Sequence, residues 1–211
     1  MSDGWGIRPA QPRDAGQIAT VLTAAFLDDP GAIIFEPDRK RRAAILPAFF
    51  GAWVRAAIAD GGDLVVPDGE VTGVATWFGP ERHGPSEAAM EAAGWEDAMA
   101  TFGEPAAARV LDMTGELERQ HELLAPWPHL RLDFFGVLPG AQETGIGSRL
   151  IEHGHRTADA AGLPCYLETF TERNVAYYGR RGWDVVASYR VGDGVPVHAL
   201  VRPPASGRTG R

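Results

Sequence analysis

A glycine-containing turn at residues 137–148 has the residue types of a phosphate-binding site. The segment reads Val-Leu-Pro-Gly-Ala-Gln-Glu-Thr-Gly-Ile-Gly-Ser, and a helical apolar face begins at Ile146. The first backbone amides of a helix lack intrahelical partners, and the helix dipole places partial positive charge there. Gly145 and Gly147 would let these amides approach phosphate oxygens closely. The turn is therefore a candidate pyrophosphate site, although two glycines also occur in ordinary strand-to-helix turns.

Two carboxylates interrupt stretches that are otherwise apolar. Asp133 stands between Leu132 and Phe134, and the two-residue period of a strand places it on the same face as Arg131. Burying a carboxylate costs free energy, which favours a functional role over an incidental one. Pairing with Arg131 or capping of a backbone amide are structural alternatives that remain open. Glu168, in the apolar stretch 164–169, is the second acidic candidate.

Other reactive side chains are expected to be structural. Cys165 lies in the same apolar stretch as Glu168, and a nucleophilic cysteine needs a positioned base, so we interpret it as inert packing. His153 and His155 are two residues apart on a predicted helix and face different ways. We therefore expect no metal. His121 and Glu122 could reach an acceptor site from a helix end, with a solvated helix end as the alternative.

The elements that position these residues follow from hydrophobic periodicity. Asp28-Asp29-Pro30 is interpreted as a helix-ending cluster. The alternation of helices and strands predicts an α/β (α+β) fold. We expect helices at 13–26, 38–60, 145–161 and 174–181, two or three helices within 79–127, and strands at 6–8, 64–66, 71–78, 130–138, 164–169, 183–189 and 195–201.

Composition limits the class of protein. The 211 residues suit a single domain at 1–203, with a helical insert at 79–127 and a flexible tail at 204–211. A formal net charge of −8 argues against nucleic-acid or anionic-membrane partners and permits an amine-bearing one. The single cysteine cannot form an internal disulfide, and no apolar run approaches eighteen residues, so we expect a cytoplasmic protein without a membrane span.

Two motifs together resemble the GCN5-related N-acetyltransferase (GNAT) superfamily. Gln-Glu-Thr-Gly-Ile-Gly at 142–147 is similar to its Q/R-x-x-G-x-G/A signature, and Asn-Val-Ala-Tyr-Tyr-Gly-Arg-Arg-Gly-Trp at 174–183 is similar to its N-x-x-x-Y-x-x-x-G-F/W segment. The opening Gly-Ile-Arg-Pro-Ala-Gln-Pro-Arg-Asp-Ala, Leu-Asp-Asp-Pro at 27–30 and Val-Ala-Thr-Trp-Phe-Gly-Pro at 74–80 resemble the puromycin-acetyltransferase-like branch. The resemblance implies a mixed sheet of six or seven strands flanked by helices, with the helical insert at 79–127 between the third and fourth strands.

The resemblance also implies a reaction and roles for individual residues. Acetyl-CoA would be the co-substrate, and its acetyl group would pass directly to an amine between two diverging strands. Tyr178 would protonate the departing thiolate, with a core aromatic as the structural alternative. Asp133 would be the leading general base, and Glu168 would serve as base or bind the acceptor's ammonium. The cofactor-binding positions would be Phe135, Gly136, Val137, Gln142, Glu143, Thr144, Gly145, Ile146, Gly147, Ser148, Asn174 and Tyr178.

Two positions depart from the family pattern. Glu143 and Thr144 stand where family members commonly have glycine and a basic residue, so the loop loses positive charge unless Arg149, Arg173 or Arg180 compensates. Three functions stay open: acetylation of a small-molecule amine, which we favour, of a protein or peptide amine, or CoA binding without turnover. Neither the length of the acyl chain nor the choice between monomer and homodimer is determined.

Overall fold

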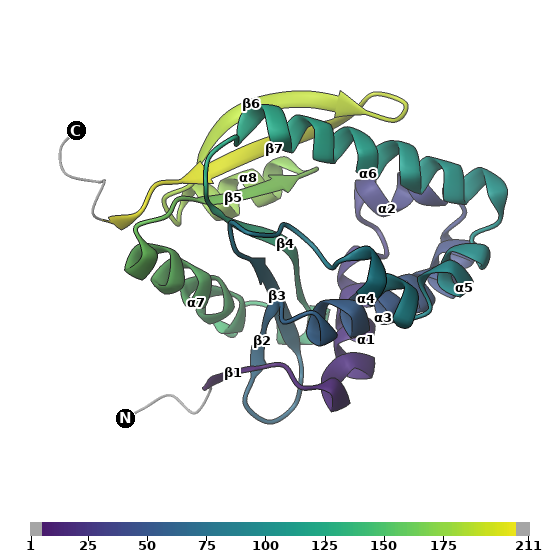
Figure 1. Ribbon diagram of the computed structural model, residues 1–211, viewed down its shortest axis with the longest axis horizontal. Helices are drawn as coiled ribbons and strands as arrows, with labels where there is room; N and C mark the ends of the chain where they lie inside the picture. The colour runs from purple at the N-terminus through teal and green to yellow at the C-terminus, as the bar shows by residue number, and fades with distance from the viewer. Residues whose placement is uncertain (1–5, 206–211) are drawn as a thin grey trace.

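A seven-stranded mixed sheet crosses the molecule, with helices on both faces (Figure 1). The structure is a computed structural model that describes residues 6–205, so residues 206–211 of the predicted tail lie outside it. The strands lie in the order β1-β2-β3-β4-β5-β7-β6, and only β4 and β5 run parallel. Their bounds are β1 Ile7–Pro9, β2 Asp63–Pro67, β3 Gly73–Phe78, β4 Leu130–Val137, β5 Cys165–Thr169, β6 Asp184–Val191 and β7 Val195–Arg202.

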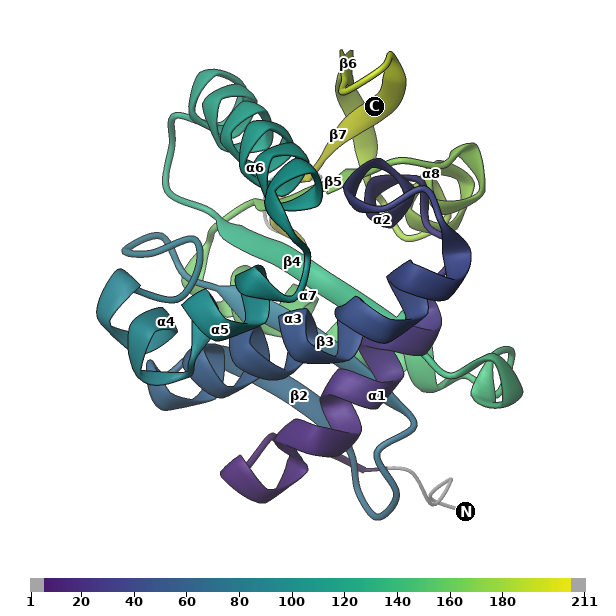
Figure 2. The same ribbon diagram turned by 90° about the vertical axis from the view of Figure 1, so that its right-hand side faces the viewer.

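Helices cover the sheet in two layers (Figure 2). One face packs against α1, α3 and the helices of the insert, and the other packs against α7 and α8. The helices are α1 Ala15–Phe26, α2 Pro30–Phe35, α3 Arg39–Ala59, α4 Glu87–Ala92, α5 Trp95–Ala100, α6 Glu104–Leu124, α7 Ile146–Ala161 and α8 Glu172–Gly179. Short 3₁₀ turns, Pro12–Asp14 and Pro139–Ala141, precede α1 and follow β4.

The insert at 79–127 contains the three helices α4, α5 and α6, within the expected number. It adds to the α1–α3 core through the buried residues Phe102, Val110 and Met113. Glycine often marks a helix break, and we also expected one at Gly115; this is wrong, because α6 continues through it. One glycine inside a 21-residue helix costs only about 1 kcal/mol, which buried neighbours offset.

The expected helix-ending cluster at 28–30 is only partly correct. It ends α1, but it also starts α2, a short helix that the sequence interpretation missed. Asp29 is the N-cap and its side chain accepts a hydrogen bond from the amide of Gly31, at 2.8 Å. Pro30 occupies the first helical position, where its missing N–H is no loss. An aspartate followed by proline is thus a helix start as well as a helix stop.

One described helix, α3, has the length and apolar composition of a membrane span. In the fold it is a core helix, with 56% of its most apolar window buried. It packs against α1, α4 and α5. Its basic first turn is not wholly solvated, because Arg42 is buried and donates to the carbonyl oxygens of Leu27 and Glu36, both at 2.6 Å.

A β-bulge divides β4. Asp133 and Phe134 together stand opposite the single residue Thr76 of β3, between the aligned pairs Trp77–Leu132 and Ala75–Phe135. The buried Thr76 hydroxyl accepts from the Phe134 amide at 2.7 Å and donates to the Phe134 carbonyl at 3.0 Å. This side chain supplies the hydrogen bonds that the interrupted ladder cannot. A bulge bends its strand and increases its twist, so β4 changes direction at Asp133.

We predict that Thr76→Val destabilises the protein. The substitution keeps the side-chain shape but leaves a buried amide and carbonyl at the bulge without partners, which costs about 1–3 kcal/mol. Urea unfolding should show this loss of unfolding free energy, whereas Thr76→Ser, which keeps the hydroxyl, should lose less. Equal stability of Thr76→Val and the wild type would contradict the bridging role of the hydroxyl.

Candidate functional site

The two parallel strands at the centre of the sheet are paired over only two residues. Leu130 aligns with Cys165 and Arg131 with Tyr166, after which no described residue of β4 pairs with β5. The bulge begins at Asp133, two residues after the last residue of β4 that pairs with β5. The remainder of β4 therefore turns away from β5 and leaves an open strand edge along 133–137. Unpaired backbone groups on such an edge can bind an extended ligand as an additional strand would.

On one face of this gap a single arginine contacts three carboxylates. Arg131 lies 2.7 Å from an oxygen of Glu118, 3.6 Å from one of Glu168 and 3.9 Å from one of Asp133. Glu168 also accepts hydrogen bonds from the hydroxyls of Tyr166 and Tyr189. The structure thus brings both predicted acidic residues together, from two strands and on one face. It adds Glu118 of α6, which the sequence interpretation did not identify.

Burial governs the protonation of this cluster. It raises the pKa of Asp133 to about 6, although Arg131 acts in the opposite direction. Burial also raises the pKa of Glu168, with Arg131 and the tyrosine hydroxyls opposing. The contact with His121, helped by Arg131, lowers the pKa of Glu118 to about 2. A carboxylate with a pKa near 6 is still mostly ionised at neutral pH and can accept a proton from an ammonium.

Tyr178 lies on the opposite face of the sheet. It is 6% exposed and belongs to the α7-side core cluster, with its ring 5.8 Å from that of Trp183 and 6.5 Å from that of Phe135. Burial and the neighbouring Tyr177 raise the pKa of the Tyr178 phenol, so it stays protonated at neutral pH. A protonated phenol can donate a proton. The carboxylate cluster and Tyr178 could act on one ligand only if that ligand passes through the gap between β4 and β5.

A fourth carboxylate, Asp29, belongs to this region, and the sequence interpretation did not propose it for the site. Asp29, the N-cap of α2, contributes to the raised pKa of Tyr178, so its charge is close to the phenol. Burial raises the pKa of Asp29 itself to about 6, against the hydrogen bonds from the Gly31 and Ala32 amides. Helix capping alone explains the Asp-Pro sequence, so the raised pKa of Asp29 could not be inferred from it.

The turn before α7 exposes unpaired backbone amides. Among the described residues, no group accepts from the amides of 143, 144 and 145, and the first amides of α7 have no intrahelical acceptor. Residues 142–145 are solvent-exposed. Gly145 has φ +89°, and Glu143, with φ +67°, occupies the same left-handed region that favours glycine. The turn therefore has the open amides of an anion-binding site, held in part by a strained glutamate.

Gly147 has a packing role in addition to the predicted one. A Cβ at this position would lie 3.1 Å from the Phe135 ring and 3.2 Å from the Tyr177 hydroxyl. Glycine therefore lets β4 and α8 approach the first turn of α7. Gly136 is similar, because a Cβ there would lie 3.0 Å from Ala25 of α1. Both glycines bring the elements around the predicted cofactor site together.

A positive charge lies at the start of α7, on a residue that the sequence interpretation did not propose. Arg181 donates to the Ser148 hydroxyl at 2.7 Å and to the Tyr177 carbonyl at 2.8 Å. Its guanidinium carbon lies 3.6 Å above the centre of the Tyr177 ring, a cation–π arrangement. The side chain is therefore held beside the exposed amides, where Thr144 supplies no charge. Asn174 is also anchored, since its side-chain amide donates to the Thr169 hydroxyl at 2.9 Å.

The remaining candidates are mostly structural. Burial raises the pKa of the Cys165 thiol to about 12, which suits inert packing. Glu122 is exposed, as a solvated helix end would be. His121 is 1% exposed, so the solvated alternative is wrong for it.

Comparison with known proteins finds acetyltransferases among the solved structures that this chain resembles. No family model matches the chain. A structure described as histone acetyltransferase HPA2 and related acetyltransferase, from Corynebacterium glutamicum, is 27% identical with a TM-score of 0.71, covering 96% of this chain and 97% of that one. A GCN5-related N-acetyltransferase from Rhodopseudomonas palustris is 17% identical with a TM-score of 0.55, covering 94% of both chains. Drosophila melanogaster polyamine N-acetyltransferase, at 14% identity and TM-score 0.59, covers 94% of this chain and 99% of its own. The last two show a shared fold.

We predict that Asp133 titrates near pH 6. Burial disfavours its charged form, whereas ordinary aspartates titrate near pH 3.9. Carboxyl ¹³C NMR between pH 3 and 8 should show two aspartates with this raised midpoint, Asp133 and Asp29, and Asp133→Asn should remove one of the two signals. A signal lost in Asp133→Asn that titrates near pH 4 would contradict the burial argument.

Proposed function

The chain belongs to the GNAT superfamily of acetyltransferases, and we propose that it transfers the acetyl group of acetyl-CoA directly to an amine of a small molecule. One observation carries the proposal. The parallel strands β4 and β5 separate after two residues, between a carboxylate cluster on one face and the protonated Tyr178 on the other. An acyl donor lying in that separation would have a base on one side and an acid on the other.

Backbone groups of β4 and of the turn before α7 make most of the contacts with the acetyl-CoA donor. The open edge of β4 at Phe135, Gly136 and Val137 pairs with the pantetheine arm, as in the family. The amides of 142–148 bind the pyrophosphate. Those of 143–145 support this, since these residues are exposed and no described group accepts from their amides. Arg181 supplies the positive charge for the phosphates, and Asn174 contacts the arm near the thioester. The packing of Gly147 against Phe135 supports this assignment, because it links the turn to β4.

The reaction needs two proton transfers. An alkylammonium with a pKa of about 10 is not nucleophilic, so Asp133 accepts its proton directly or through one water. The amine nitrogen then attacks the thioester carbonyl, forming a C–N bond while the C–S bond breaks. Tyr178 donates its proton to the departing thiolate. The raised pKa of Tyr178 supports this role, because only the protonated phenol can act as an acid.

The charge of the cluster favours a cationic acceptor. Glu118, Asp133 and Glu168 face a single guanidinium, that of Arg131, so the region carries excess negative charge when the three are ionised. Glu168 binds the acceptor's ammonium through this charge. Solved structures of similar fold are described as agmatine, polyamine and arylalkylamine N-acetyltransferases, all named for small amines. We place the enzyme in the cytoplasm, as a monomer or homodimer.

Thiol release from acetyl-CoA over a panel of amines and peptides tests this function. We expect turnover with polyamines or arylalkylamines, and a kcat about 10²–10⁴-fold lower for Tyr178→Phe with unchanged CoA affinity. Asp133→Asn should abolish the fall in rate below pH 6. Asp29→Asn is its matched control, because it removes the other carboxyl group with a pKa of about 6 and should keep that fall. Turnover of peptides alone would favour a protein acetyltransferase. CoA binding without any turnover would indicate a CoA-binding module that has no acetyltransferase activity.

We predict that Arg181→Gln weakens CoA binding. The guanidinium stands at the first turn of α7, and a hydrogen bond to a charged phosphate is worth about 1.5–3 kcal/mol, which is about tenfold or more in Kd. Isothermal titration calorimetry with CoA should show this loss. The exposed neighbour Arg180 provides the control, since Arg180→Gln should bind almost as the wild type does. Equal losses from both variants would indicate a general charge effect.

A further inference from the structure

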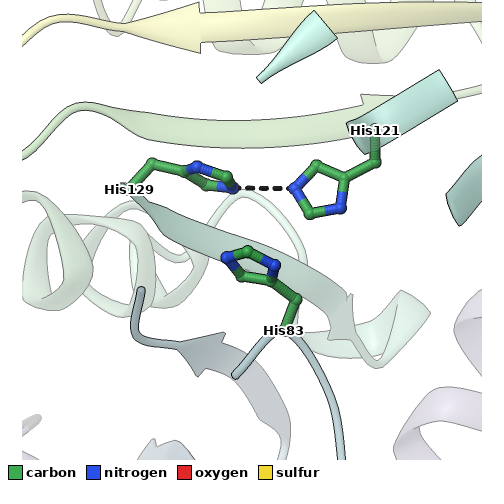
Figure 3. A group of neighbouring side chains, drawn as sticks. All are labelled: His83, His121 and His129. Atoms are coloured by element: carbon green, nitrogen blue, oxygen red, sulfur yellow. Dashed lines mark hydrogen bonds between the residues drawn. The ribbon is translucent and has the colours of Figure 1, made fainter. Parts of the chain in front are cut away.

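Three histidines from separate segments meet beside the carboxylate cluster (Figure 3). His83 follows β3, His121 lies near the end of α6, and His129 immediately precedes β4. One ring nitrogen of each lies within 4.8 Å of the others. His121 and His129 are fully buried, at 1% and 0% exposure. None of them has a part in the acetyl transfer proposed above.

The hydrogen bonds fix where two of these rings carry lone pairs. His129 Nδ1 lies 2.6 Å from the Trp127 carbonyl oxygen, which can only accept, so Nδ1 carries the proton and Nε2 is unprotonated in the neutral ring. His121 Nε2 lies 2.8 Å from this Nε2 and supplies the proton between them. His121 Nδ1 lies 3.3 Å from both Glu118 and Arg131. A shift of the His121 proton to Nδ1, facing Glu118, would turn both Nε2 atoms into lone-pair donors.

The third histidine has an unused nitrogen. His83 Nε2 is buried and has no hydrogen-bond partner among the described residues. The other ring nitrogens of the cluster lie within 4.8 Å of this one, so the unused nitrogen points into the group rather than to an unrelated site. A buried polar atom without a partner costs free energy that a bound cation would recover.

We propose that His83, His121 and His129 form a zinc site with three imidazole ligands and an open fourth position. Imidazole nitrogens suit zinc, which binds them at about 2.0–2.1 Å, so neighbouring ligand nitrogens stand about 3.3 Å apart in a tetrahedral site. The His121 and His129 nitrogens must separate slightly from 2.8 Å. The His83 ring, now stacked at 13° on His129, must turn so that its plane meets the ion. His83 is only half-buried and follows a strand end, so it can do so.

The surroundings match those of metal-binding histidines. Such histidines commonly donate their second N–H to a carboxylate or a backbone carbonyl, which orients the ring. Glu118 offers the carboxylate to His121, and Trp127 offers the carbonyl to His129. Arg131 is a nearby positive charge that opposes a cation, but it is bound to Glu118 at 2.7 Å and to two further carboxylates. The site therefore carries compensating negative charge.

The position of the site gives it a mechanical consequence. His83 lies near the start of the insert at 79–127, and His121 and His129 lie at its end. A zinc ion bound by all three would fasten both ends of the insert to the start of β4. Because Glu118 contacts both His121 and Arg131, the ion would also be coupled to the charges at the acceptor side.

Cobalt binding to the chelator-treated protein tests the proposal without any acyl donor. We expect one Co²⁺ per chain, with visible absorption bands of a four-coordinate imidazole site, and displacement of this Co²⁺ by Zn²⁺. His83→Gln should weaken Co²⁺ affinity at least tenfold, since it removes one of the three ligands, and it does so at a half-buried position. Hydrogen exchange within 79–127 should slow when zinc is added.

The matched control is His153→Gln, which removes a histidine on α7, paired with Asp63 and outside the cluster. It should bind Co²⁺ as the wild type does. Circular dichroism checks that both variants fold. The proposal is overturned if the folded wild type binds no Co²⁺ at millimolar concentration, or if His83→Gln binds as tightly as His153→Gln. Because the readout is metal binding, either result leaves the proposed acetyl transfer to be judged by its own assays.

Discussion

The separation of β4 from β5 is the constraint on which the rest of the site depends. Two parallel strands in a sheet would ordinarily remain paired, and their backbone groups would then be unavailable to a ligand. Here the extra residue at Asp133–Phe134 bends β4 shortly after its last pair with β5. The hydroxyl of Thr76 stabilises this bend, because it hydrogen-bonds both backbone groups of Phe134. The sheet thus opens in its middle while Phe134 keeps its hydrogen bonds on the β3 side.

The same bulge also distributes the chemistry between the two faces of the sheet. Before the bulge, the side chains of Arg131 and Leu132 lie on opposite faces of the sheet, as successive side chains of a strand do. Within it, Asp133 and Phe134 both stand opposite one residue, so Phe135 returns to the α7 face beside Tyr178 while Asp133 remains near Arg131. The proposed base and the proposed acid are therefore kept apart by the sheet itself. They are connected only through the gap, which prevents the two from neutralising each other directly.

Features that depend on neighbouring residues in the chain could be predicted from the sequence, and features that depend on distant ones could not. The turn before α7 and the pairing of Asp133 with Arg131 on one face are local, and both are present. The bulge was missed because its partner, Thr76, is far away in sequence. Arg181 was missed because its position depends on how α8 packs on α7. The histidine cluster was missed for the same reason, since only His153 and His155 are close enough in sequence to be compared.

The loop that departs most from the family pattern shows how the fold can compensate for a local cost. Glu143 adopts a left-handed conformation, which costs a non-glycine residue about 1–2 kcal/mol, and it also adds a negative charge next to an anion-binding turn. Its side chain is exposed, so solvent screens that charge. Arg181 is instead fixed by the Tyr177 ring and the Ser148 hydroxyl, and an ordered charge acts more strongly than a mobile one. Positive charge can therefore be supplied by α8 rather than by the loop, and the amides of the turn remain free to bind the phosphates.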